Sequence, residues 1–448
     1  MFDSVTVKIM TKYVKSQEAL PACLHIWDTT PTQTAIIETK TLDFYPTSAI
    51  DNSDVISFQI PGLHGYMLDK VQILTDIRVQ TAENGNPAQN TNVSTVPHLA
   101  AALWRNVEVT CGGTSLTQSF ANSYSLFKFW ETIIHSTEGT KFLLWEKEGL
   151  LLDNVGTKAH SEDVVFYPVA DDDGNVPRVV NHHGLKRANR IAQGQTVSLI
   201  SDLDVPLFNQ EKLLPQNLDI QVNLTKNHDG FILMEAEAGT HKIEFVKAVL
   251  RCTFQRPNDM VLNIIEERLA RENAIYHADK QVLSFHPITQ GAQEVTIENL
   301  FNGTLPYCFL VGVQDRAAFG RARNKNPFSL HPIQSVQLFV NGSEHFPRPL
   351  ERTTEEYGVM YDTFLRQLGY PNNGDSLLHN HYKVYPAIAF DLTPDKTQNQ
   401  HSLNLVKSGS VRLSLGLENE AAQNTVLMVL AWYEQIIEIS KERQLTIV

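Results

Sequence analysis

Hydrophobic and polar positions alternate along much of the chain, and one arrangement of them occurs twice. Residues 104–118, WRNVEVTCGGTSLTQ, and residues 333–347, IQSVQLFVNGSEHFP, each contain an alternating segment, a two-residue turn and a second alternating segment. The turns are Gly112 with Gly113 and Asn341 with Gly342, pairs that suit the tight turns of β-hairpins. The pattern therefore predicts equivalent hairpins in the two halves of the chain.

The similarity continues beyond the hairpins. A helix-like segment follows each hairpin, and the later segments SLISDLDVPL and AIAFDLTPDK align Asp202 with Asp391. Equivalent residues are 229 positions apart at Gly112 and Asn341 but 189 apart at the aspartates. A repeat of this length is far longer than a solenoid unit and predicts two tandem domains of one fold. The change in separation places about 40 extra residues in the first copy, between its helix and the strand at Ser198.

These patterns suggest an N-terminal arm over 1–35, a first domain over 36–238 and a second domain over 239–448. The extra residues form a long loop insertion in the first domain, at about 136–195. The domain boundary is expected in the polar stretch EAEAGT, and the strand KIEFVKAVLRCTF after it is expected to begin the second domain.

Two further elements are predicted in the second half. A helix should begin after Pro257, capped by Asn258 or Asp259, because an apolar face at helical spacing follows. The run TVLMVLAWYEQIIEI near the C-terminus is continuous enough to be a single buried central strand.

Composition favours an all-β protein. The 448 residues are 42% hydrophobic, which is enough to fill two cores. Only 19% are charged, while the 23 glycines and 20 prolines suit many short strands and turns.

Charge and cysteine usage narrow the function classes. A net charge of −13 argues against a dedicated nucleic-acid surface, which draws on clustered Lys and Arg. The four cysteines lie far apart without CxxC spacing, so neither a zinc knuckle nor a disulfide framework is indicated. No apolar run is long enough for a membrane span.

The histidine pairs are the nearest approach to a metal motif. His379 and His381 would share one face of a strand, but no acidic ligand follows them. His182 and His183 are adjacent, so their side chains would point apart on extended backbone; a solvated loop or an interface suits them better. No GxSxG, HExxH, P-loop or GxGxxG motif is present, and neither a catalytic set, a metal site nor a cofactor is predicted.

The densest basic cluster lies in VQDRAAFGRARNKNPF. It contains Arg316, Arg321, Arg323 and Lys325, with Phe319 and Phe328 between or after them. Such a cluster is a solvated loop, or it contacts nucleic acid or the acidic surface of a partner; the solvated loop is the more common case.

The second half resembles a known family. The succession FNGTLPYCFLVGVQDRAAFGRARNKNPFSL, SVQLFVNGSEHFPRPLE, PAIAFDLTPD and HSLNLVKSGSVRLSLGLE, ending in QIIEIS, is similar to the hexon-like major capsid proteins of Polinton/Maverick elements and adintoviruses, which belong to the adenovirus-like lineage. The resemblance covers residues 300–440, whereas the first half matches through its length and the duplication.

The resemblance implies two tandem eight-stranded antiparallel jelly-roll sandwiches, with short helices and long loops between strands. Three chains would form a homotrimeric, pseudo-hexameric capsomer of an icosahedral virion. The insertion at 136–195 would be a tower in the trimer contact, and the arm at 1–35 would reach neighbouring capsomers or penton and minor capsid proteins. Synthesis would occur in the host cytoplasm and assembly within the cell, with the nucleus as one candidate compartment.

Three alternatives to a major capsid protein stay open. A bicupin-like or copper-dependent enzyme would need sets of histidine ligands that the sequence does not provide. A cellular two-domain β-sandwich that binds a ligand would be monomeric and carry an aromatic-lined cleft. A penton or minor capsid protein would have a single sandwich.

Overall fold

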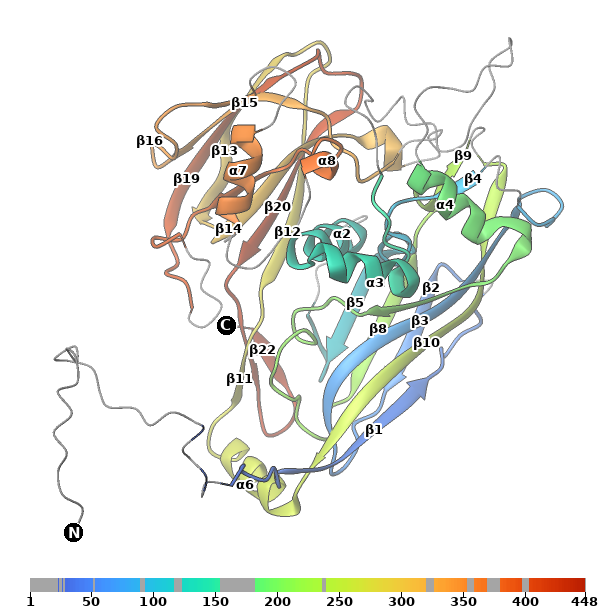
Figure 1. The fold of residues 1–448 in the computed structure, drawn as a ribbon. Coiled ribbons are helices and arrows are strands. Elements are labelled where there is room, and N and C mark those ends of the chain that lie inside the picture. The colour runs from blue at the N-terminus through green and yellow to red at the C-terminus, as the bar shows by residue number, and fades with distance from the viewer. Residues whose placement is uncertain are drawn as a thin grey trace.

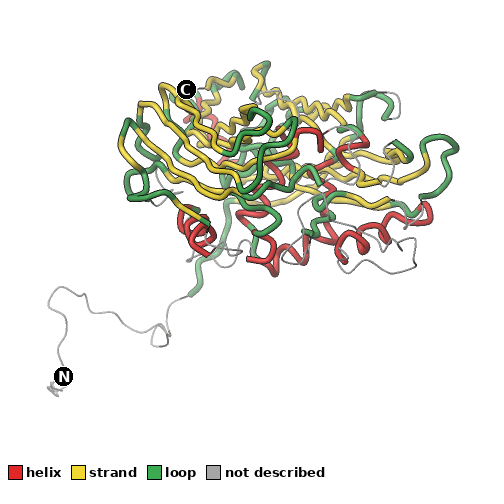
Figure 2. The backbone as a smooth tube through the Cα atoms, turned by 90° about the horizontal axis from the view of Figure 1, so that it is seen from above, coloured by secondary structure: helices red, strands yellow, loops and turns green. Residues whose placement is uncertain are grey.

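The computed structural model contains two β-sandwiches side by side (Figure 1). It describes residues 29–50, 53–88, 93–116, 123–153, 182–235, 239–319, 326–352, 358–368, 379–396 and 403–447, together with Cys23 and Ile26. Most of the expected N-terminal arm lies outside these residues. Seen from above, most helices lie along one side of the strands (Figure 2).

The first sandwich consists of two four-stranded sheets. One sheet has the order β1-β10-β3-β7, formed by Ile36–Phe44, His241–Pro257, Met67–Thr81 and Val197–Asp202. The other has the order β2-β8-β5-β6, formed by Val55–Ile60, Ile220–Lys226, Trp104–Cys111 and Thr114–Ser115. Buried and half-exposed residues alternate along β3, as expected for a strand with one face in the core.

The second sandwich repeats this arrangement strand for strand. Its sheets have the orders β12-β20-β14-β18 and β13-β19-β15-β16. The first contains Lys280–Pro287, Thr425–Tyr433, Cys308–Asp315 and Ile388–Asp391; the second contains Glu294–Thr304, Ser408–Leu417, Ile333–Val340 and Ser343–Glu344, with β17 (Leu350–Glu351) also paired to β15. All these pairings are antiparallel, so each sandwich is an eight-stranded jelly roll, as predicted.

The two hairpin turns are confirmed at the residues expected. Cys111 pairs with Thr114 across the first turn, and Val340 pairs with Ser343 across the second. All four turn residues have positive φ, with Gly112 at 53°, Gly113 at 84°, Asn341 at 52° and Gly342 at 78°. These values match a two-residue turn whose central positions both require the left-handed region.

The expected boundary between the domains is wrong. Strand β10, which begins at His241, pairs with β1 and β3 of the first sandwich rather than opening the second. The polar stretch before it therefore leads from β9 (Leu233–Glu235), which pairs with β4 (Val93–Thr95), into the last strand of the first sandwich. The chain passes to the second sandwich after Pro257, through α6 (Asp259–Leu269), whose N-cap is Asn258 as predicted.

The C-terminal run is two strands rather than one. Strand β20 ends at Tyr433 and is central in its sheet, whereas β21 (Ile436–Ile439) pairs with β11 (Ala274–His277) and β22 (Leu445–Ile447) in a separate small sheet. The β21–β22 hairpin therefore leaves the second sandwich.

The expected insertion is not a continuous loop. It belongs to the connection from β6 to β7, and two helices occupy its ends, α3 (Glu138–Glu148) and α4 (His182–Ile191, continued by a 3-10 turn at Ala192–Gly194). Thr137 caps α3, because its hydroxyl accepts a hydrogen bond from the N–H of Thr140. Residues 154–181 lie outside the described part of the chain.

The remaining helices within the described residues range from single turns to the 13-residue α2. They are α1 (Leu99–Ala102), α2 (Ser123–His135), α5 (Asp229–Ile232), α7 (Gly358–Gln367), α8 (His379–Tyr382) and a 3-10 turn at Arg316–Phe319. Helices α7 and α8 lie between β16 and β18, in the connection equivalent to the one that holds α2, α3 and α4.

The buried apolar residues form two clusters. One fills the first sandwich and extends into the second, where it includes Leu310, Phe328 and Tyr385. The other, which includes Phe309 and Leu338, lies within the second sandwich. A core continuous between the sandwiches indicates that they are packed as one body.

Candidate functional site and assembly surfaces

Aromatic side chains from both sandwiches meet between them, in a region we call the seam. Phe129 of α2 stacks on Phe328, with ring centroids 4.1 Å apart and ring planes 11° apart. Tyr385 lies 5.4 Å from Phe129 by the same measure, and Phe231 approaches Phe328 at 5.7 Å. These contacts bury large apolar areas and hold the sandwiches together.

A carboxylate in α2 extends the seam with hydrogen bonds. Trp432 Nε1 donates to Glu131 Oε1 at 2.6 Å, and Gln281 Nε2 donates to the same oxygen at 3.1 Å. Burial of Glu131 favours its neutral form, but the hydrogen bonds from His135 and Trp432 outweigh burial and lower its pKa. The carboxylate is therefore ionised near neutral pH and accepts hydrogen bonds from the second sandwich.

A buried ionic network joins the two segments of the β6–β7 connection that flank residues 154–181. Arg187 is 0% exposed and donates to Asp153 Oδ1 at 2.6 Å and to the carbonyl oxygen of Leu151 at 2.6 Å. Asn326 of the second sandwich donates to Asp153 Oδ2 at 2.8 Å and to Tyr385 Oη at 3.0 Å. The network therefore ties Asp153 to α4 through Arg187, and to the second sandwich through Asn326.

The C-terminal hairpin contacts the first sandwich at the predicted turn. A Cβ atom at Gly112 would lie 2.1 Å from the carbonyl oxygen of Arg443, so only glycine fits there. Arg443 Nη2 donates to Glu266 Oε1 of α6 at 2.6 Å, and its Nε donates to the carbonyl oxygen of Gln216 at 2.7 Å. The turn therefore has a docking role in addition to closing its hairpin.

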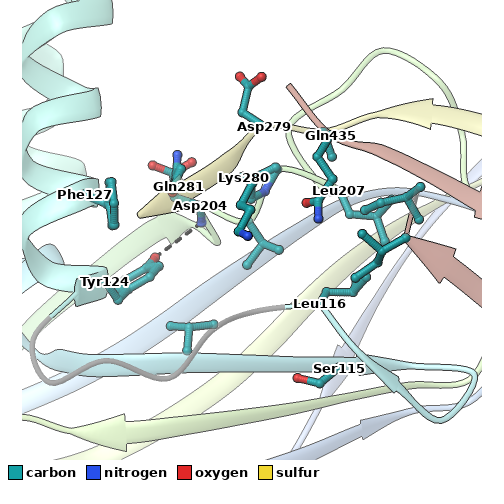
Figure 3. Close-up of a pocket in the computed structure, with 16 residues that line it drawn as sticks. Ser115, Leu116, Tyr124, Phe127, Asp204, Leu207, Asp279, Lys280, Gln281 and Gln435 are labelled. Atoms are coloured by element: carbon teal, nitrogen blue, oxygen red, sulfur yellow. Dashed lines mark hydrogen bonds between the residues drawn. The ribbon is translucent and has the colours of Figure 1, made fainter. Parts of the chain in front are cut away.

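A cleft of about 290 Å³ lies between the sandwiches, beside α2 (Figure 3). Tyr124 and Phe127 line it from one side, and Asp279, Lys280 and Gln281 line it from the other. Burial raises the pKa of Asp279 to about 6, although a hydrogen bond from Tyr307 opposes the shift. The lining is mixed apolar and polar.

The described residues hold no group of three or more His, Cys, Asp and Glu side chains arranged to bind a metal ion. Among the same residues, no helix is both long and apolar enough to cross a membrane.

The predicted interface residues are only partly within the described structure. Arg316 is exposed, with its guanidinium carbon 5.8 Å from the ring centroid of Phe285. Arg321, Arg323 and Lys325 lie outside the described residues, as does the side chain of His182. His183 is half-buried in α4 and lies beside His381 of α8, a proximity that neither pair's spacing could indicate.

Helix α3 exposes two large apolar side chains and buries two charged ones, which sequence reasoning missed. It buries Lys141 and Glu148, which are 6% and 2% exposed, yet exposes Phe142 at 74% and Leu143 at 70%. The available signal was the segment KFLLWEKE within a region expected to be a solvated loop. The inner face also buries Trp145, so it is mixed rather than apolar throughout. Two adjacent exposed apolar side chains on such a helix are typical of an interaction surface.

No family model and no curated protein matches the sequence. The structure, in contrast, is similar to solved viral structures. A chain in the cryo-EM structure of the Sputnik virophage matches 97% of this chain and 93% of its own length, with a TM-score of 0.66 and 11% identity. This chain has the double jelly-roll fold.

Two capsid proteins share the fold over nearly their full lengths. The Faustovirus major capsid protein matches 92% of this chain and 92% of its own, with a TM-score of 0.60 and 8% identity. The mavirus major capsid protein matches 98% and 97%, with a TM-score of 0.52 and 11% identity. The double jelly roll implied by the sequence resemblance is therefore confirmed.

Proposed function

We propose that this chain is a major capsid protein that assembles as a homotrimer, the pseudo-hexameric capsomer of an icosahedral virus shell. The observation that carries the proposal is the repetition of one strand order in two adjacent sandwiches. Three such chains place six similar sandwiches around a threefold axis, which suits a hexagonal lattice. The capsid proteins named above share this fold over at least 92% of the chain, which supports the same role.

A permanent trimer needs large self-complementary surfaces, typically of more than about 2,000 Å². The exposed pair Phe142 and Leu143 is our candidate for an apolar anchor in that contact. It lies on α3, at one end of the region 136–195 that we propose as the tower. In the proposed trimer, a second copy of the chain would pack against this pair.

Replacing Phe142 and Leu143 together with serine tests this surface. Both side chains are exposed, so the change should leave the β-rich circular dichroism unaltered but shift the trimer toward monomer in light scattering. The matched control is Val359→Ser, which removes a 55% exposed apolar side chain from α7. A double variant that stays as trimeric as the unmodified protein would show that α3 is not in the contact.

The remaining parts of the proposal concern partners and location. The role is non-catalytic, within the virion, and without specific nucleic-acid binding. The arm at 1–35 is proposed to contact neighbouring capsomers or penton and minor capsid proteins. We propose synthesis in the host cytoplasm and assembly inside the cell, in the cytoplasm or the nucleus.

A cellular ligand-binding protein is the main competing function, since the cleft beside α2 has an aromatic contribution from Tyr124 and Phe127. That function predicts a monomer. A penton protein is expected to have one sandwich, so the duplication argues against it.

A further inference from the structure

Helix α6, which connects the two sandwiches, carries apolar side chains on its outer surface. Leu262 and Leu269 are buried on its inner side. Met260 and Ile264 are 71% and 58% exposed, and their spacing of four residues places them on the same side of the helix. We call this pair the α6 face. Large exposed apolar side chains on one side of a helix are typical of a contact with another chain segment.

The N-terminal arm leaves the first sandwich beside this helix. The N–H of Asn258, the N-cap of α6, donates to the carbonyl oxygen of Ala35 at 2.7 Å, and β1 begins there (Figure 1). Ile37 of β1 is 57% exposed. Cys23 and Ile26 of the arm are also exposed, Ile26 by 71%. The described residues of the arm therefore leave the α6 face of their own chain uncovered.

The arm contains an apolar segment that suits this face. Residues 20–27 are LPACLHIW, with apolar side chains at Leu20, Leu24, Ile26 and Trp27. Tryptophan is among the residues that most often anchor protein interfaces. Such a segment gains free energy when it is buried against another apolar surface, and the α6 face is such a surface.

Charge favours the same contact. Residues 4–17, which precede the apolar segment, contain three lysines and no acidic residue, although the whole chain has a net charge of −13. Asp259 and Glu267 are exposed on α6 next to the α6 face. Arg268 is exposed as well, but it is paired with Glu272 and so contributes little opposing charge. The arm and the helix therefore carry complementary charges.

The arm is long enough to reach another copy of the chain. From Cys23 to Ala35 the extended backbone spans about 40 Å, whereas the 11 residues of α6 are about 16 Å long. We propose that residues 20–27 of one copy dock on the α6 face of a neighbouring copy. The proposal rests on the capsid role and names the surface that receives the arm. Each copy then donates one arm and receives another.

Cross-linking between two distinguishable chains tests the contact. Cys23 is exposed within the arm segment, whereas Cys111, Cys252 and Cys308 are buried. The unmodified full-length chain is co-expressed with a tagged chain that carries Cys23→Ser and Met260→Cys, and the purified protein is treated with a short bismaleimide. A covalent dimer of one tagged and one untagged chain is expected, because an arm that docks on a neighbouring copy brings the two thiols together.

The matched control is a tagged chain with Cys23→Ser and Val359→Cys, which places the thiol at a 55% exposed position of α7. Docking raises the local concentration of the two thiols to about the millimolar range, so the Met260→Cys chain should form at least about tenfold more mixed dimer than the control at micromolar protein. Ile264→Cys should behave like Met260→Cys and takes its place if that variant does not fold.

The outcomes separate this contact from the capsid role. A protein that is trimeric in light scattering but gives no mixed dimer, or as much as the control, overturns the docking and leaves the capsid role standing. A chain that keeps Cys23, carries Met260→Cys and is cross-linked only within itself shows that the arm covers its own α6, which also overturns the proposal. A monomeric protein that gives no mixed dimer overturns both.

Discussion

Gly112 and Gly113 are neighbours with similar backbone conformations but different surroundings. Both have positive φ, at 53° and 84°. A Cβ atom at Gly112 would lie 2.1 Å from the carbonyl oxygen of Arg443, whereas nothing lies within 4 Å of a Cβ atom at Gly113. The pair therefore separates the cost of left-handed backbone from the cost of displacing the C-terminal hairpin.

Alanine substitution at each position measures the two costs. Gly113→Ala should lower the free energy of unfolding by about 1 kcal/mol, the usual cost of an L-residue with positive φ. Gly112→Ala should cost about 2 kcal/mol more, because a backbone segment must move. Thermal unfolding of the two variants checks this, and equal losses would contradict the docking role of Gly112.

At the residue scale, the sequence predicted the conformation of the two turns but not the distant residues that they contact. Gly-Gly and Asn-Gly between alternating segments specify a tight hairpin locally, so their conformation could be predicted. The contact between Gly112 and Arg443 joins residues that are far apart in the chain and could not. The approach of His183 to His381 was missed for the same reason.

At the scale of elements, the Arg187 network fixes how the β6–β7 connection attaches to the sandwiches. Replacing Arg187 with methionine would leave the buried carboxylate of Asp153, which is 1% exposed, without its cationic partner. The expected loss in free energy of unfolding is about 3–5 kcal/mol, as for other broken buried ion pairs.

Arg251→Met is the matched control for this change. Arg251 of β10 forms a bidentate pair with Asp43 of β1, but its side chain is 36% exposed, so water compensates for its removal. The measurement is thermal unfolding of both variants. Losses of similar size would show that the buried network does not hold the connection.

The order of elements along the chain was easier to predict than the sandwich to which each strand belongs. The change in repeat separation located the longer connection in the first copy, because an insertion shifts every later residue equally. The strand at His241–Pro257 was assigned to the wrong domain, since a polar stretch precedes a strand equally well inside a domain and between domains. Only the pairing of this strand with β1 and β3, which are distant in the chain, shows that it belongs to the first sandwich.

Similarly, the apolar run near the C-terminus is continuous in sequence, so nothing in it indicated that it forms two strands in different sheets. Gln435 lies between β20 and β21. The apolar residues on either side of this break are buried against different sheets, and hydrophobicity alone does not distinguish one sheet from another.

At the scale of the whole molecule, the duplication is the feature with the clearest consequence. Two sandwiches of the same strand order, joined by a continuous core, form one rigid building block with two similar halves. A threefold arrangement of such blocks approximates sixfold symmetry. The proposed capsid function therefore rests on threefold self-association, which neither a ligand-binding monomer nor a fivefold penton protein shares.

The most direct test is the mass of the purified full-length chain, measured by size-exclusion chromatography with light scattering at micromolar concentration. The capsid proposal predicts a species of three times 50.4 kDa, with threefold particles in negative-stain images. A single species of 50.4 kDa with no concentration dependence would contradict the proposal.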